Sequence, residues 1–235
     1  MLKILKQIFQ TATLRQTLIT TTGTILNGIL GFLFYTILAK NLGPESFGLF
    51  VVSITTLTLV ADIVDLGVNS SLVKFVSINI SSGETKMAYR FLKLGLQIKL
   101  AVWFLVLLIG EIIAPFIAAF IFQKPELVIP LRIVFIGVGG AMFFSLATST
   151  FQSLAKFKLW SGLNIVINFL RLTIILVILN FGFLNLQNSL IVYITSLFLG
   201  FFISLVFLPT KQILSSVDQL SLFKSFFDMR KINSS

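Results

Sequence analysis

The sequence predicts an all-α integral membrane protein, built as a bundle of six transmembrane helices. Of its 235 residues, 57% are hydrophobic and only 11% are charged, whereas soluble domains are about half apolar and a quarter charged. A soluble globule of this size cannot hide so much apolar surface from water, but helices in lipid expose it without cost. The apolar residues also gather into six stretches, each long enough to cross a bilayer.

Turn-forming or charged residues separate the six expected spans. The breaks fall at Gly43-Pro44, residues 81–83, Lys124-Pro125, residues 156–158, residues 185–188 and Pro209. As helices, the stretches between them can each cross about 30 Å of hydrocarbon. They comprise residues 17–38, 47–73, 100–122, 128–153, 159–181 and 189–208. The second and third look long, so we expect them to tilt or to project beyond the bilayer.

The segments outside the spans define three regions. Residues 1–14 are expected to be a cytoplasmic amphipathic lead-in, residues 15–209 the six-helix transmembrane region, and residues 210–235 a cytoplasmic tail. Apolar residues recur among charged ones in the tail, from Leu214 to Phe226. This pattern suits a short interfacial helix, and an ordinary frayed terminus is the alternative.

The distribution of Lys and Arg predicts the orientation, because cytoplasmic loops carry an excess of both. With the N-terminus inside, the outer side holds only Lys40, Lys124 and Arg132. The cytoplasmic side then holds Lys3, Lys6, Arg15, Lys74, Lys86, Arg90, Lys93, Lys99, Lys156, Lys158, Lys211, Lys224, Arg230 and Lys231. We therefore expect a multi-pass protein of the cytoplasmic membrane with both termini in the cytoplasm.

Composition also narrows the chemistry. The chain has no Cys and no His, which removes thiol nucleophiles, disulfides, imidazole bases and the usual nitrogen and sulfur metal ligands. We expect no cofactor, no metal and no enzymatic activity, since the outer loops offer few acids beyond Glu45 and Glu126 and no Asp-x-Asp occurs. The net charge of +10 does not predict nucleic-acid binding, because the basic residues flank apolar runs.

Polar residues inside the spans align on single helical faces. Steps of three and four place Asp62, Asp65 and Asn69 on one stripe of the second span, and Asn164, Asn168 and Arg171 on one stripe of the fifth. The first span contributes Thr24 and Asn27, and the fourth contributes Gln152. Buried polar groups are expensive in hydrocarbon. These stripes should therefore converge on a shared wet interior and not face lipid.

Two interpretations of the charged residues remain open. Asp62 and Arg171 lie near the middle of their spans and need a partner or water. An ion pair between them would simply lock two helices. Alternatively, the charges line an aqueous cavity.

In the cavity interpretation, each stripe has its own role. Arg171 would attract a phosphate-bearing substrate, with Asn168, Asn164, Asn27, Thr24 and Gln152 as further cavity residues. The carboxylates of Asp62 and Asp65, together with Asn69, would carry a coupling proton or ion. The small and hydroxyl residues on these faces also suit close helix packing, and Lys74, Lys93 and Lys99 are expected to snorkel to the cytoplasmic headgroups.

Three segments resemble a known family. They are residues 38–50, which contain Gly43-Pro44, residues 65–75, and residues 151–160, which lead into Asn164 and Arg171. These segments resemble the polysaccharide-precursor (Wzx-type) branch of the multidrug, oligosaccharidyl-lipid and polysaccharide exporter superfamily. The resemblance covers roughly residues 15–209, and the three segments come in the family's order at the span boundaries.

The resemblance implies one lobe of a V-shaped transporter of two six-helix lobes, with alternating access between them. The expected substrate is a lipid-linked oligosaccharide, and the expected partners are membrane lipids and a second six-helix lobe from another copy or another chain. We expect the chain to take part in flipping that lipid across the cytoplasmic membrane. The alternatives are a lobe of a cation-coupled drug exporter and a non-transporting assembly subunit or truncated fragment.

Overall fold

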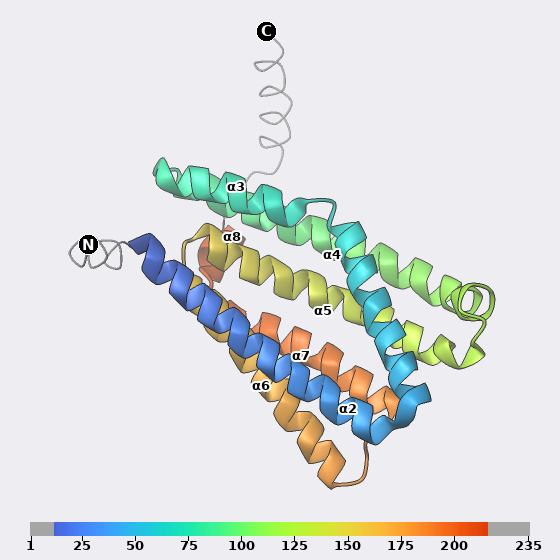
Figure 1. The fold of residues 1–235 in the computed structure, drawn as a ribbon. Helices are drawn as coiled ribbons and strands as arrows, with labels where there is room; N and C mark the ends of the chain where they lie inside the picture. The colour runs from blue at the N-terminus through green and yellow to red at the C-terminus, as the bar shows by residue number, and fades with distance from the viewer. Residues whose placement is uncertain (1–11, 216–235) are drawn as a thin grey trace, which may run out of the picture.

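The computed structural model describes residues 12–215, and every regular element in that range is helical. The expected lead-in, residues 1–14, lies outside the described residues except where α2 begins at Ala12. Of the expected interfacial helix in the tail, only α8 (Thr210–Ser215) is described. The remaining elements form the bundle in Figure 1.

The first helix, α2 (Ala12–Asp65), consists of two arms that meet at Gly43. Gly43 has φ 77° and ψ 163°, a conformation that glycine adopts without the steric cost of a Cβ. Pro44 follows at the first position of the second arm, where its missing N–H is not needed. The chain therefore reverses here, as the Gly-Pro turn predicts, and the two arms diverge from this point in Figure 1.

A second break follows Asp65. Leu66 and Gly67 both have positive φ, at 49° and 75°, and α3 (Val68–Ser81) begins directly after them. The expected second span, residues 47–73, is therefore not one continuous helix. Its stripe of Asp62, Asp65 and Asn69 is divided between two helices.

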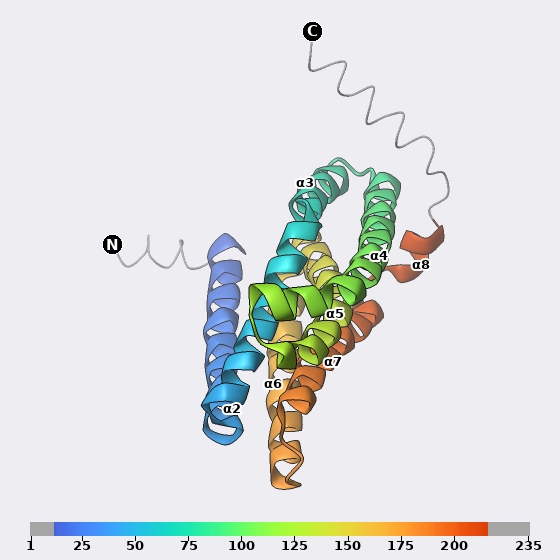
Figure 2. The ribbon, with the colours of Figure 1, turned by 90° about the vertical axis from the view of Figure 1, so that its right-hand side faces the viewer.

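The third apolar segment begins much earlier than its hydropathy suggests. α4 (Thr85–Phe116) starts at Thr85, not near residue 100, and pairs with α3 as a hairpin. Figures 1 and 2 show this hairpin along one edge of the bundle. Beyond Pro115, the π-helical turn η1 (Ile117–Ile121) and the 3-10 turn η2 (Pro125–Leu127) lead into the next helix.

The central helix is α5 (Val128–Ser153), which contacts α2, α3, α4, α6 and α7. Two of its glycines permit close packing: a Cβ at Gly139 would overlap the Trp103 ring, and one at Gly137 would meet Ile194 and Leu57. α6 (Phe157–Asn180) packs on the first arm of α2, and α7 (Leu186–Phe207) packs on α5. α5 therefore separates the α3–α4 hairpin from α6, as Figure 2 shows.

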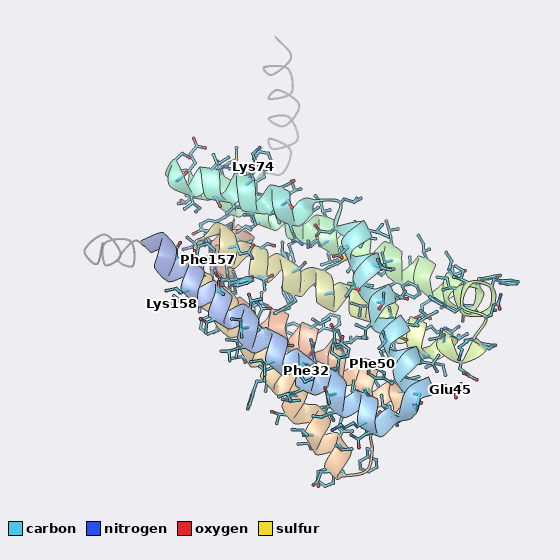
Figure 3. All side chains as sticks on the ribbon, in the orientation of Figure 1. Phe32, Glu45, Phe50, Lys74, Phe157 and Lys158 are labelled. Carbon is cyan, nitrogen blue, oxygen red and sulfur yellow. The ribbon has the colours of Figure 1, made fainter. Side chains whose placement is uncertain are left out.

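The protein is a multi-pass membrane protein by the hydropathy of its helices. Five helical segments of the described residues are long and apolar enough to cross a membrane, and the first of them contains both arms of α2. Lys74 and Lys158 lie toward one end of the bundle and Glu45 lies at the other, as Figure 3 shows. Charge is thus distributed unevenly along the axis that the helices follow.

Candidate functional site

The polar side chains inside the bundle form two hydrogen-bonded networks. One joins the end of α2 to α3, α4 and α5, and the other joins the first arm of α2 to α6 and α7. Within residues 12–215, no hydrogen bond or ion pair connects the two networks. The expectation of one shared interior is therefore replaced by two separate polar sites.

The first site, here called the Lys99 network, comprises Asp65, Asn69, Lys99, Ser145 and the Met142 carbonyl. The Lys99 ammonium lies 2.8 Å from Asp65 Oδ1 and donates to Asn69 Oδ1 at 2.8 Å. It also donates to Ser145 Oγ and to the Met142 carbonyl oxygen, both at 3.1 Å. The Lys99 side chain is 1% exposed, so its amino group is enclosed among four helices.

Each oxygen of the Asp65 carboxylate has its own task. Oδ1 pairs with Lys99, and among the described residues this buried oxygen has no other partner. Oδ2 accepts the backbone N–H of Asn69 at 3.2 Å, which satisfies a donor in the first turn of α3 that has no partner within the helix. Asp65 therefore holds the start of α3 and the Lys99 ammonium at once.

The expected snorkelling of Lys99 is wrong. Hydropathy places Lys99 at the edge of an apolar run, where a lysine normally reaches the headgroups. In the structure α4 extends well beyond Lys99 and is covered by α3, so this lysine is enclosed by protein. The four-residue spacing of Lys99 to Gly95 and to Trp103, which pack on α3 and α5, is a sequence signal that Lys99 shares an inward face.

A small cavity adjoins the Lys99 network. Its volume is about 200 Å³. The carboxylates of Asp62 and Asp65 and the amide of Asn69 contribute to its lining. Thr58, Ala61, Ala141, Met142 and Ser145 complete the lining. The Asp62 side chain is exposed. No group of three His, Cys, Asp or Glu side chains gathers in the described part of the chain, so the oxygens here offer no multi-carboxylate metal centre.

The second site, here called the Arg171 network, is built on α6. Arg171 donates from Nε to Ser196 Oγ at 2.9 Å and from Nη1 to Asn168 Oδ1 at 3.4 Å. Asn168 in turn donates to Asn27 Oδ1 at 3.1 Å, across to the first arm of α2. The guanidinium carbon lies 3.9 Å from the centre of the Tyr193 ring, within the range of a cation–π contact.

No carboxylate neutralises Arg171 among residues 12–215. The three ion pairs found there join Lys99 to Asp65, Lys124 to Glu45, and Arg132 to Glu111. The ion pair between Asp62 and Arg171, one of the two interpretations left open by the sequence, is therefore not formed, because Asp62 and Arg171 belong to different sites. Arg171 is only 8% exposed and is held by neutral oxygens and aromatic rings.

The other expected cavity residues divide between the sites. Asn164 adjoins the Arg171 network, since its backbone oxygen accepts from Asn168, while its own amide donates to the Trp160 carbonyl. Thr24 is exposed and donates to the Thr20 carbonyl of its own helix. Gln152 is half-buried, and no side-chain hydrogen bond joins it to either site within the described range. The structure thus brings together Asn27, Asn168 and Arg171, but not Thr24 or Gln152.

Two hydroxyl residues of these sites were not among the predicted site residues. Ser145 and Ser196 are the hydroxyls that receive Lys99 and Arg171. Serines on inward faces are common in membrane helices, so packing was a sufficient explanation for both. Each serine differs from its neighbours only because it lies opposite a buried cation. Sequence spacing alone does not reveal that position.

Comparison with known protein families identifies the family to which this chain belongs. A family model described as "Polysaccharide biosynthesis protein" matches residues 13–230, nearly the whole chain. No curated protein and no solved structure gives a significant match. The match covers all three segments that carry the resemblance, the break after Asp65 and both polar sites. The chain belongs to the polysaccharide biosynthesis protein family.

Proposed function

We propose that this chain takes part in flipping a lipid-linked oligosaccharide across the cytoplasmic membrane, and that Arg171 binds a phosphate group of that lipid. The observation that carries the proposal is a buried arginine with no carboxylate partner in residues 12–215. A buried charge of this kind is costly unless something offsets it. An anion that arrives and leaves with each cycle would do so.

The chemistry of the side chain suits a phosphate. A guanidinium presents planar, paired N–H donors that match phosphate oxygens, and it keeps its charge in an apolar setting. Ser196 and the Tyr193 ring orient the Arg171 group in advance, which lowers the entropy that binding would cost. An anionic headgroup would compete with Asn168 for Nη1, because the hydrogen bond from Nη1 to Asn168 is the longer of the two that Arg171 donates.

Neighbouring amides suit the sugar part of the same substrate. Asn27, Asn164 and Asn168 lie half-buried on the facing surfaces of α2 and α6. Amides both donate and accept hydrogen bonds, as sugar hydroxyls do. In this proposal the amides contact the glycan while Arg171 holds the phosphate.

The proposed orientation places the basic end in the cytoplasm. That end carries Lys74 and Lys158, opposite Glu45 at the far end, as Figure 3 shows. The positive-inside rule supports this direction. Basic groups there would also attract an anionic lipid headgroup entering from the inner leaflet.

A second six-helix lobe is part of the proposal. A substrate cavity between two lobes needs a facing wall, and we assign that wall to another copy of this chain or to another chain. The glycan would then be recognised jointly by both lobes, with Arg171 supplying the charge from this side.

The test measures lipid-linked glycan in the outer leaflet of cells that lack the chromosomal gene. Cells that express the native chain should restore the glycan, Arg171→Lys should restore part of it, and Arg171→Ala should leave little. Arg132→Ala is the matched control, because Arg132 is an exposed arginine paired with Glu111. Equal glycan levels in the deletion strain and in cells with the native chain would contradict the proposal.

A second candidate is a lobe of a cation-coupled drug exporter. The exposed carboxylate of Asp62 beside the 200 Å³ cavity favours it, whereas the pairing of Asp65 with Lys99 counts against it. Export of a cationic dye that is lost in Asp62→Asn would place this candidate first. A non-transporting assembly subunit is distinguished by the neighbouring reading frame, where about six further spans indicate a split transporter.

A further inference from the structure

Four oxygens from three helices surround the Lys99 ammonium. Asp65 Oδ1 and Asn69 Oδ1 lie at 2.8 Å, and Ser145 Oγ and the Met142 carbonyl oxygen lie at 3.1 Å. Asp65 comes from α2, Asn69 from α3, and Met142 and Ser145 from α5. The four oxygens of this set, which we call the oxygen cage, therefore come from α2, α3 and α5, whereas α4 supplies the lysine.

The oxygen cage has the composition of a cation site. Carboxylate, amide, hydroxyl and backbone carbonyl oxygens are the ligands that hard cations take in proteins. Only one of the four carries a formal charge, that of Asp65, so a single positive charge balances the set. A divalent ion would carry one charge more than the cage oxygens balance, because the other carboxylate of the cavity, that of Asp62, is exposed and lies outside the cage. The ligands thus favour a monovalent cation.

The cavity beside the network gives such a cation access. Its lining includes all four residues of the oxygen cage, together with the exposed carboxylate of Asp62. An ion in the cavity would meet Asp62 first and the cage oxygens next. Lys99 is not among the lining residues, because its ammonium reaches the oxygens from the α4 side.

We infer that the oxygen cage is a monovalent-cation site whose resident cation is the ammonium of Lys99. The tethered ammonium makes the native site independent of dissolved ions. A small monovalent cation takes the place only when the lysine side chain is gone. This inference does not depend on the proposed flipping activity, since it concerns a different network from that of Arg171.

The experiment follows thermal unfolding of the purified full-length chain in lipid nanodiscs. Sodium chloride, potassium chloride and choline chloride are compared at equal ionic strength, for the native chain and for Lys99→Ala. Lys99→Ala should melt at a higher temperature in sodium or potassium than in choline, with saturation. At about five times the dissociation constant, linkage gives a rise of about 2–4 °C. The native chain should show no difference between the three salts.

Two control variants identify the source of the effect. Lys99→Ala combined with Asp65→Asn removes the charged oxygen, so its melting temperature should not respond to the cation. Lys86→Ala, at an exposed lysine of the same helix, should behave like the native chain. Magnesium chloride should stabilise Lys99→Ala no more than choline chloride does once ionic strength is matched.

The outcomes decide the inference in each case. Saturable stabilisation of Lys99→Ala that vanishes in the double variant supports it. Insensitivity of folded Lys99→Ala to sodium and potassium overturns it, and so does a larger response to magnesium. If Lys99→Ala cannot be purified in any salt while the double variant folds, the oxygen cage cannot hold a free cation and the inference also fails.

Discussion

The Lys99 ammonium and the Asp65 carboxylate meet at 2.8 Å, at the point where α2 ends and α3 begins. This pair unites an almost fully buried cation with a carboxylate that is 17% exposed. Removal of one partner leaves the other charge without compensation, whereas removal of both leaves neutral groups. The two kinds of variant should therefore differ sharply in stability.

We predict that Lys99→Met lowers the free energy of unfolding by about 3 kcal/mol. Adding Asp65→Asn to it should recover most of that loss, because the buried carboxylate charge disappears. Reversible unfolding in mixed micelles, arranged as a double-mutant cycle, measures both values. Simple additivity of the two single losses would show that the residues do not act as a pair.

The hydroxyl that orients Arg171 provides a second prediction. Ser196→Ala removes the 2.9 Å acceptor of Nε, and hydrogen bonds to charged groups contribute about 1.5–3 kcal/mol. We expect a stability loss in that range and a matching loss of lipid-linked glycan in the outer leaflet. Thr195→Ala is the control, because Thr195 is the exposed neighbour on α7. Equal effects of both variants would argue against an orienting role for Ser196.

A third prediction concerns the contact between α4 and α5. Gly139→Ala places a methyl group against the Trp103 ring, and overpacking of this kind costs about 1–3 kcal/mol. Gly162→Ala on α6 is the matched substitution, since nothing lies within 4 Å of a Cβ there. It should be neutral or stabilising by up to about 1 kcal/mol, because alanine is the better helix former. Melting temperatures of the two variants, compared side by side, test the difference.

The turn at Gly43 gives a fourth prediction. With φ at 77° and ψ at 163°, a region occupied almost only by glycine, alanine at this position is strained by about 1–3 kcal/mol. Gly48→Ala is the control, because Gly48 lies in the helical second arm with open space at its Cβ. Thermal unfolding should rank Gly43→Ala well below Gly48→Ala. A lower melting temperature for Gly48→Ala than for Gly43→Ala would mean that the two arms of α2 do not meet at a positive φ at residue 43.

Orientation in the membrane is tested by labelling. The chain contains no cysteine, so a single introduced thiol is a unique target. Glu45→Cys should react with a membrane-impermeant maleimide in intact cells, and Lys158→Cys should react only after the membrane is opened. Reaction of Lys158→Cys in intact cells would reverse the proposed topology.

Much of the fold follows from local signals in the sequence. Hydropathy locates the apolar helices, and the Gly43-Pro44 turn is readable because glycine suits a positive φ and proline suits the first position of a helix. The stripe of Asn168 and Arg171 also points inward as its spacing predicts, since α6 is one unbroken helix. Where a helix is continuous, its periodicity carries over to three dimensions.

The stripe of the second span is interrupted because its helix is not continuous, although Asp62, Asp65 and Asn69 still line one cavity. Three-to-four spacing places Asp65 and Asn69 on one face only if the helix continues, and the positive φ values of Leu66 and Gly67 end that continuity. A hydropathy profile does not reveal this break, because apolar residues flank it and it falls inside the expected span. The partner of Asp65 comes from α4, distant in sequence and at the margin of its apolar run. No local pattern links the two.

The break in the helix at Leu66 and Gly67, where φ is positive, also has a mechanical consequence. The helix is interrupted at this point, so bending is easier here than within an uninterrupted helix. Asp65 lies before the pivot and Asn69 lies after it, yet both grip the same ammonium. A rotation of α3 relative to α2 must therefore lengthen or break the contact of Lys99 with Asp65 or with Asn69. Lys99 therefore ties the end of α2 to the start of α3 across this break.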